Sequence, residues 1–552
     1  MAIDDLWYRN AIIYCLDVEK YMDGNGDGVG DFQGLNQRLS YLAGLGVTCV
    51  WLLPFSRTPN RDNGYDVQDY YSVDPKHGSL GDFVDFTNHA KSLGIRVVVD
   101  LVVNHTSCEH PWFQQARRSR TSPLRDWYVW ADERPANHAD GVVFPGVQKT
   151  TWTWDDEAQQ YYFHRFYEFQ PDLNTWNPAV REEITRIMGF WLELGISGFR
   201  MDAVPFLIEK KGAGVKPERD FDLLHEMRDF LQWRCRDAVL LAEANVPADE
   251  SQKYFGPQGD RLQLMLNFPV NQRLWYALAT GDVDPLASAI EETAETPAQA
   301  QFVQFLRSHD ECDLGRLSDE QRQKVFAACG PKPSMQLYNR GIRRRLAPML
   351  GGDPQRLRLA LSLLLALPGT PMLQYGDEIG IWDDLALPER ECARTAMQWS
   401  DDHYGGFSSS SRRVIPIVDD EEHGYRRINV AAQRRDPESL LNWTERRIRA
   451  RKELPELSWG HCTVVRTDTP GVLVLLSVWR DTAVLTVHNL TDQERSVHFE
   501  VRRANGRHLF DFFDEDHSEA GGDGRHHLTL RPYANTWYRV GSADPTLDRT
   551  RR

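Results

Sequence analysis

The strongest constraint on the fold of this chain is a series of eight short apolar runs, separated by longer segments with helical periodicity. Each run is almost continuously apolar, which indicates strands buried on both faces, as in a parallel sheet covered by helices. Eight such units predict a closed (β/α)₈ barrel, although a doubly wound sheet uses similar units. The runs lie at residues 11–18, 49–54, 97–103, 198–204, 238–245, 262–270, 302–310 and 371–376, with helix-like segments such as 35–45, 80–93 and 181–194 between them.

Two regions fall outside this alternation. Residues 106–173, between the third and fourth strands, are rich in Trp and Tyr with little helical periodicity, which predicts an inserted B domain overhanging the barrel mouth. After residue 457, short alternating strands such as 472–479, 483–490 and 527–530 predict a C-terminal antiparallel β-sandwich. The expected domains are therefore the barrel in two parts (1–105 and 174–456), the insertion (106–173) and the sandwich (457–552).

Charge and cysteine content narrow the classes of function. A net charge of −16 argues against nucleic acid and against an anionic membrane as partners. The start of the chain has no signal-peptide pattern, and the longest apolar run, 359–367, is too short to span a bilayer of ~30 Å. Eight scattered cysteines show neither a disulfide framework nor a zinc motif, which favours a reducing cytoplasm.

Charged side chains occur at the C-terminal ends of several apparently buried strands, among them Arg200, Asp202, Glu243 and Asp310. A structural ion pair would explain any one of them, but a barrel brings all these ends to one mouth. Two or three carboxylates in one pocket, without a serine or cysteine nucleophile motif, suit glycosidic bond cleavage by a nucleophile and a proton donor. The charge of Arg200 would keep Asp202 ionised, and apolar neighbours would raise the pKa of Glu243.

The same strand ends carry motifs that resemble those of glycoside hydrolase family 13, the α-amylase family. The motifs are DLVVNH (100–105), GFRMDAV (198–204), AEAN (242–245), SHD (308–310), QPDLN (170–174) and GYDVQDY (64–70), in the family's order. The resemblance covers essentially the whole chain. It implies a retaining enzyme in which Asp202 is the nucleophile, Glu243 the acid/base and Asp310 the stabiliser of the transition state.

The resemblance also implies a glucose pocket, which in exo-acting members is closed at one end by an acid and an arginine. Asp66 and Arg394 match that clamp, and Tyr65 would offer a stacking ring; a surface ion pair is the alternative for Arg394. The expected substrate-binding residues are Tyr65, Asp66, His105, Arg200, His309 and Arg394.

The glycine-rich segment 23–31 has oxygens at alternate positions, as calcium loops do. Its twelfth position is Gly34, so it is not an EF-hand, and a solvated acidic turn is the alternative. The resemblance implies a structural Ca²⁺ held by Asp23, Asn25, Asp27, Asp31 and the carbonyl of Val29, with no organic cofactor. A second calcium site, or an equally plausible structural cluster, is implied at Asn104, Asp172, Phe206, Leu207 and Glu209.

Within the family, three segments are similar to trehalose synthases, which break maltose and rejoin the freed glucose through its anomeric oxygen. They are HPWFQ (110–114), GIRRRLAPMLG (341–351) and YGDEIG (375–380) followed by DDLALPER (383–390). The segments SHDECDLG (308–315) and IWDD (381–384) depart from that subgroup, so an exo-acting α-glucosidase hydrolysing maltose, sucrose or short α-glucans is the alternative. A catalytically dead binding protein is disfavoured because all three carboxylates are present. The expected partner is a small α-glucoside, and a homo-oligomer is an open option.

Overall fold

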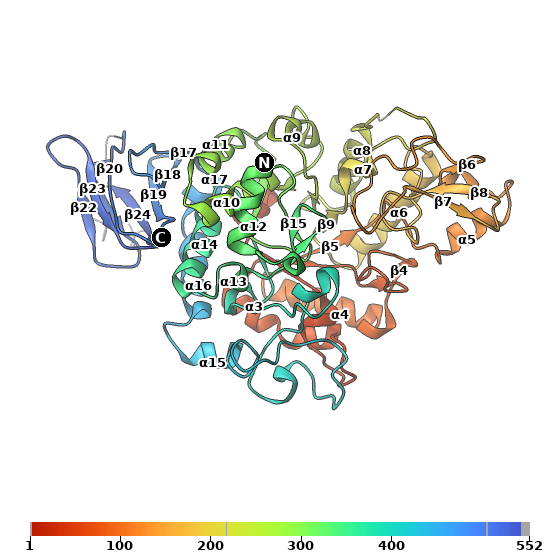
Figure 1. Cartoon of the computed structure of the whole chain (residues 1–552), viewed down its shortest axis with the longest axis horizontal. Helices are drawn as coiled ribbons and strands as arrows, with labels where there is room; N and C mark the ends of the chain where they lie inside the picture. The colour runs from red at the N-terminus through yellow and green to blue at the C-terminus, as the bar shows by residue number, and fades with distance from the viewer. Residues whose placement is uncertain (1–2, 217, 504–505, 542–552) are drawn as a thin grey trace.

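The computed structural model describes residues 3–216, 218–503 and 506–541. At its centre, eight parallel strands close into a barrel in the order β1-β16-β12-β11-β10-β9-β5-β2 (Figure 1). Each strand overlaps one of the eight apolar runs, so the predicted (β/α)₈ barrel is confirmed, and closure excludes a doubly wound sheet. The strands are β1 (Ile13–Leu16), β2 (Cys49–Leu52), β5 (Arg96–Leu101), β9 (Gly198–Met201), β10 (Val239–Ala242), β11 (Leu264–Leu266), β12 (Gln301–Phe305) and β16 (Thr370–Gln374).

The continuous apolar character of these strands follows from burial on both faces. In β10, Val239 and Leu241 pack inside the barrel, whereas Leu240 and Ala242 pack against the surrounding helices. Alternate side chains of a strand point to opposite faces, so both sets must be apolar here. The barrel interior is a packed core, and polar side chains are left to the strand ends.

Helices surround the barrel, and several begin at side-chain caps; α4, for example, starts at a capping box formed by Ser79 and Asp82. The predicted helix at 35–45 is two short helices, α2 and α3, which meet at Arg38. No helix in the described ranges is both long and apolar enough to cross a membrane. The helices are α1 (Val18–Tyr21), α2 (Phe32–Gln37), α3 (Leu39–Leu45), α4 (Leu80–Ser92), α6 (Pro178–Glu193), α7 (Val204–Leu207), α8 (Asp222–Arg234), α9 (Ala248–Phe255), α10 (Phe268–Thr280), α11 (Asp284–Glu292), α12 (Asp319–Cys329), α13 (Leu346–Met349), α14 (Pro354–Ala366), α15 (Val430–Arg435), α16 (Leu440–Lys452) and α17 (Pro455–Trp459).

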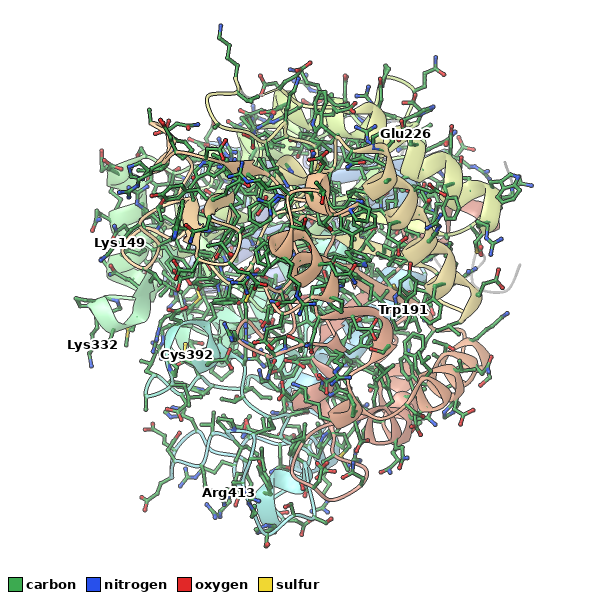
Figure 2. All side chains as sticks on the ribbon, turned by 90° about the vertical axis from the view of Figure 1, so that its right-hand side faces the viewer. Lys149, Trp191, Glu226, Lys332, Cys392 and Arg413 are labelled. Carbon is green, nitrogen blue, oxygen red and sulfur yellow. The ribbon has the colours of Figure 1, made fainter. Side chains whose placement is uncertain are left out.

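Between β5 and β9 the chain leaves the barrel and forms a small antiparallel sheet of its own. Val129, Trp152 and Phe163 pack into a separate core there, which accounts for part of its aromatic content. The insertion lies at the opposite end of the molecule from the C-terminal strands (Figure 1). Figure 2, seen from the insertion side, shows Lys149 at the surface and Trp191 within. Its elements are α5 (Pro111–Arg118), β6 (Trp130–Ala131), β7 (Trp152–Asp155) and β8 (Gln160–Phe163), in the sheet order β6-β8-β7.

The C-terminal region forms two antiparallel sheets, as the alternating pattern predicts. Val474 and Leu485 of the larger sheet share one hydrophobic core with Val497 and Leu530 of the smaller sheet. Two sheets joined by such a core form a β-sandwich. Residues 542–552, which the sequence assigns to the same domain, lie outside the described residues. The strands are β17 (His461–Val464), β18 (Val472–Trp479), β19 (Thr482–Asn489), β20 (Arg495–Phe499), β21 (His508–Asp511), β22 (His517–Glu519), β23 (His526–Leu530) and β24 (Asn535–Gly541).

Candidate active site

Asp202, Glu243 and Asp310 line one cavity of about 630 Å³ at the barrel mouth. Asp202 directly follows β9 and Glu243 directly follows β10, while Asp310 lies in the loop after β12. Ala203 adopts a left-handed backbone (φ 48°), so the chain turns sharply immediately after Asp202. Other lining residues come from the insertion and from later loops: Gly141, Val142, Val143, Phe144, Phe166, Glu311, Asp313, Gly315, Arg316, Arg340 and Arg390.

Arg200 is the electrostatic centre of this cavity. Its side chain is 1% exposed, and its Nη1 donates to Asp202 Oδ1 at 2.7 Å and to Asp100 Oδ1 at 2.5 Å. Its Nη2 also donates to Glu243 Oε2. One guanidinium cannot neutralise three carboxylates, so the three must share their protons.

Asp202 and Glu243, which directly follow β9 and β10, differ in their protonation states. Burial raises the pKa of Asp202 to about 6 against the lowering effect of Arg200. Burial raises the pKa of Glu243 further, to about 8, and the charge of Asp202 adds to that rise. At neutral pH, Asp202 is therefore the carboxylate and Glu243 the carboxylic acid. Such a divergence is the electrostatic signature of a nucleophile beside a proton donor.

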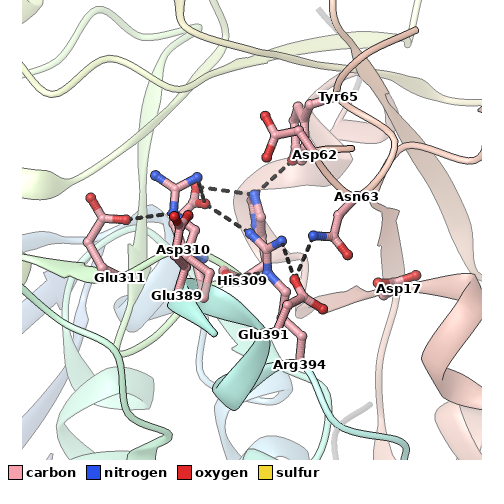
Figure 3. A network of polar contacts seen from close by, with 12 residues as sticks. Asp17, Asp62, Asn63, Tyr65, His309, Asp310, Glu311, Glu389, Glu391 and Arg394 are labelled. Carbon is pink, nitrogen blue, oxygen red and sulfur yellow. Dashed lines mark hydrogen bonds and ion pairs between the residues drawn. The ribbon is translucent and has the colours of Figure 1, made fainter. Parts of the chain in front are cut away.

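Asp310 lies in the opposite electrostatic environment, among cations. Arg390 Nη1 lies 2.9 Å and Arg394 Nη2 3.3 Å from its Oδ1. Burial alone would raise the pKa of Asp310, but the charge of Arg390, followed by those of other cations, lowers it well below its usual range. Figure 3 shows this cluster, with Arg394 lying between the side chains of Glu391 and His309. Asp310 therefore stays ionised at neutral pH.

Tyr65 lines the cavity and is supported by His309. Their rings stack at 5.5 Å with an interplanar angle of 8°, and the Tyr65 hydroxyl lies 2.7 Å from His309 Nε2. Burial lowers the pKa of His309 to about 3, which leaves the imidazole neutral. His105 also lines the cavity, and its Nε2 lies 3.1 Å from the Tyr65 carbonyl. The structure therefore brings together the expected glucose-pocket residues Tyr65, His105, Arg200 and His309.

Asp66 is not part of the cavity, and its predicted role as the acid of the clamp is wrong in this structure. The side chain is fully buried, where Oδ1 accepts from the Thr58 hydroxyl at 2.9 Å and Oδ2 from the Arg61 N–H at 3.0 Å. Asp62 lines the cavity instead, and burial raises its pKa against the charge of Arg390. Arg394 lies next to the cavity lining, where its Nε donates to the His309 carbonyl at 2.8 Å and its Nη2 lies 3.3 Å from Asp310 Oδ1. Asp62 and Arg394 are therefore the candidates for the two sides of the clamp.

Phe144, which lines the cavity, belongs to an aromatic cluster that the sequence did not single out. Phe144 of the insertion packs 4.8 Å from the rings of both Tyr167 and Tyr338. The hydroxyls of Tyr167 and Tyr338 both donate to Glu389 Oε2, at 3.1 and 3.2 Å. Arg390 lies over the ring of Phe144 at 5.0 Å. We call Phe144, Tyr167 and Tyr338 the aromatic wall; it joins the insertion, which carries the first two, to the distant segment around Tyr338.

The loop 23–31 has the side-chain oxygens expected of a calcium loop, but these oxygens accept hydrogen bonds from backbone N–H groups of the same loop. Asp23 Oδ1 accepts from the Asn25 N–H at 3.0 Å, and Asp27 Oδ1 accepts from the Val29 N–H at 2.8 Å. Asp31 accepts from the Gly24 N–H, and burial raises its pKa, with the charge of Asp23 adding to the rise. In the described part of the chain, no three acidic, His or Cys side chains gather as metal ligands. The donor set fits calcium, whereas convergence on one ion would require side-chain rotation.

The second expected calcium set is only partly assembled. Asn104 and Asp172 lie together, with Asn104 Nδ2 donating to Asp172 Oδ2 at 3.1 Å. Glu209 instead pairs with Arg165, and the Leu207 carbonyl accepts from the Thr175 hydroxyl at 2.6 Å. The ring of Phe206 packs against Phe166 of the cavity wall. These residues do not form a metal site in this arrangement.

A closed (β/α)₈ barrel with Asp202, Glu243 and Asp310 around one cavity at its C-terminal mouth is typical of glycoside-processing enzymes. The sequence model described as alpha amylase, catalytic domain, matches residues 16–460, and that of the sucrose hydrolase-like C-terminal domain matches residues 482–539. The chain belongs to glycoside hydrolase family 13, the α-amylase family.

Relatives extend this comparison over the whole chain. A trehalose synthase of Thermus thermophilus is 40% identical over 99% of this chain, which spans only 56% of that protein. A trehalose synthase of Pimelobacter sp. (strain R48) is 38% identical, with 98% of this chain and 97% of the relative covered. Among solved structures, an α-glucosyl transfer enzyme, XgtA, is 26% identical with a TM-score of 0.80, covering 97% of this chain and 99% of that one.

Proposed function

We propose that the protein is a retaining enzyme acting on small α-glucosides such as maltose, and that it isomerises maltose as a trehalose synthase does. The observation that carries the proposal is the shared cavity of Asp202, Glu243 and Asp310, in which the first is ionised and the second protonated at neutral pH. The names of the relatives described above support the choice of maltose as substrate.

In the proposed mechanism, the Asp202 carboxylate attacks the anomeric carbon of the non-reducing glucose and forms a covalent glucosyl ester. Glu243 gives its proton to the departing glycosidic oxygen, so glucose leaves neutral. The Glu243 carboxylate then takes the proton from the anomeric hydroxyl of that glucose. The resulting oxygen displaces Asp202, which completes trehalose and restores both groups. Asp310, held ionised by Arg390 and Arg394, binds sugar hydroxyls throughout.

Isomerisation rather than hydrolysis requires that the freed glucose stay and that water be kept out. The aromatic wall supports this requirement, because it ties the insertion to the segment carrying Glu389 and Arg390 beside the cavity. A clamp of Asp62, which lines the cavity, and the neighbouring Arg394 would favour a single glucose over an internal stretch of a long glucan.

Incubation with maltose tests the reaction. We expect trehalose as the main product with glucose as a minor one, because the aromatic wall retains the leaving sugar. The products are separated by anion-exchange chromatography in the presence of ¹³C-labelled free glucose. Unlabelled trehalose indicates transfer within the pocket, and labelled trehalose indicates exchange with solvent glucose. Glucose without trehalose would contradict isomerisation and support the exo-acting α-glucosidase.

The proposal includes a structural Ca²⁺ at loop 23–31, supported by the acidic donor set of Asp23, Asp27 and Asp31. At a concentration 100 times its Kd, Ca²⁺ stabilises the folded state by about 2.7 kcal/mol, which raises Tm by a few degrees. Scanning fluorimetry of EDTA-treated protein measures this rise. We expect Asp27→Ala to abolish it and Asp401→Ala, at another exposed carboxylate, to retain it. An equal rise in both variants would contradict binding at the loop.

The proposal also specifies the ligand of the protein and the compartment in which it acts. A small α-glucoside is the ligand, with neither nucleic acid nor a membrane required. The eight cysteines are unpaired and six of them are buried, which supports a reducing cytoplasm as the place of action.

A further inference from the structure

Lys211 has an unusual place for a lysine, deep between the barrel and the insertion. Its side chain is 1% exposed, and its ammonium lies 2.8 Å from Asp172 Oδ2, whose side chain is fully buried. The same ammonium donates to Asn104 Oδ1 at 2.8 Å, to the Leu173 carbonyl at 3.1 Å and to the Asn104 carbonyl at 3.3 Å. Four oxygens from two distant segments therefore surround one positive charge.

The oxygens around Lys211 include those that a calcium ion would use at this place. Carboxylate, amide and carbonyl oxygens are the donors that Ca²⁺ prefers, but Ca²⁺ binds them at 2.3–2.6 Å. The observed separations of 2.8–3.3 Å are those of N–H···O hydrogen bonds. The other expected ligands are engaged elsewhere, Glu209 with Arg165 and the Leu207 carbonyl with Thr175.

We propose that Lys211 is the built-in cation of this site and that its ammonium excludes a divalent metal there. The buried position of the Asp172 carboxylate explains why a cation is needed at this site. Asn104 ends the chain's path out of the barrel and Asp172 begins its return from the insertion, and an isolated bridge joins His105 to Asp172. A carboxylate buried at that junction must be paired.

Two of the residues that bind the Lys211 ammonium, Asn104 and Asp172, contact or adjoin residues that line the cavity. Asn104 precedes His105, and Asn104 Nδ2 lies 3.3 Å from His105 Nδ1. Asp172 Oδ1 accepts from the Arg165 N–H at 2.7 Å, next to Phe166, which lines the cavity with His105. Lys211 is thus a positioning residue for one side of the sugar pocket, and it does not itself line the cavity.

The proposal is tested with two variants that remove the charge in different ways, both built on Asp27→Ala so that loop 23–31 contributes nothing. Lys211→Ala leaves space for an ion among the four oxygens, whereas Lys211→Met fills that space with an apolar chain. We expect both to lose several degrees of Tm in EDTA, because Asp172 is left unpaired. Calcium should restore the Tm of Lys211→Ala and leave that of Lys211→Met unchanged.

A kinetic readout separates positioning from simple destabilisation. With maltose as substrate, Lys211→Ala should raise KM ~10-fold with a smaller change in kcat, and calcium should reverse the rise. Failure of calcium to restore Lys211→Ala, or equal restoration of Lys211→Met, would overturn the proposal. If neither Lys211 variant folds, calcium binding to the Asp27→Ala protein tests the proposal. After equilibrium dialysis against calcium it should contain no bound ion at this site, and one equivalent per chain would contradict the assignment.

Discussion

Replacing Asp202 with asparagine is expected to lower kcat for maltose by at least ~10⁴-fold, since loss of an enzymic nucleophile typically costs that much or more. The amide has nearly the volume of the carboxylate but cannot form the glucosyl ester. Arg200 would still be paired with Asp100 and Glu243, so the cavity should keep its shape. Initial rates of maltose consumption, measured by chromatography of the products, give the change in kcat.

Asp401→Asn makes the same chemical change at an exposed carboxylate and should keep the wild-type rate. Equal thermal unfolding of the Asp202→Asn variant and the wild type would attribute the loss to chemistry. Asp202→Asn with more than a tenth of the wild-type kcat would contradict the nucleophile assignment and require another carboxylate. Asp100 is then the first alternative, because it shares Arg200 and burial also raises its pKa to about 6.

The fold could be predicted because its signal is local and repeated. Every barrel strand is buried on both faces, so apolar runs mark each strand independently of the others. The observed strands are shorter than the runs where the chain turns toward the cavity. β9 ends at Met201, and the left-handed Ala203 directs Asp202 to the mouth before the apolar run itself ends.

The choice between Asp62 and Asp66 as the acid of the clamp could not be made from the sequence. Asp62 and Asp66 flank the same tyrosine, and their spacing does not reveal which side chain enters the cavity. Asn63 (φ 48°) and Gly64 (φ 90°) both adopt left-handed backbone, so the chain reverses between Asp62 and Asp66. Glycine allows such a turn, and the alternation of a regular strand no longer applies.

The aromatic wall and Lys211 could not be found in the sequence for a different reason. Phe144, Tyr338 and Arg390 lie in three loops that are brought together only by the closed barrel. Lys211 approaches Asn104 and Asp172 from a fourth segment. The oxygens at Asn104 and Asp172 are visible in the sequence as candidate ligands, but the cation that meets them is decided by tertiary packing.

Replacing Glu243 with glutamine is expected to lower kcat for maltose by ~10²–10⁴-fold, which is the usual contribution of a general acid. The loss should be much smaller for 4-nitrophenyl α-glucoside, because nitrophenolate leaves without a proton. Rates on the two substrates, measured with the same preparation, give the contrast. Glu250→Gln, at another carboxylate that lines the cavity and pairs with Arg219, is the matched control. Its loss should be the same for both substrates.

The pH profile of the wild type provides an independent test of the same assignment. Asp202 must be ionised to attack, so kcat/KM for maltose, which reports on the free enzyme, should fall as the pH drops through about 6. Glu243 must be protonated to act as an acid, so kcat/KM should fall again as the pH rises through about 8. The two limbs belong to a coupled pair. On maltose, whose leaving group needs the proton, Glu243→Gln should keep the lower limb and lose the upper one. An upper limb that persists in that variant would assign the transferred proton to another group.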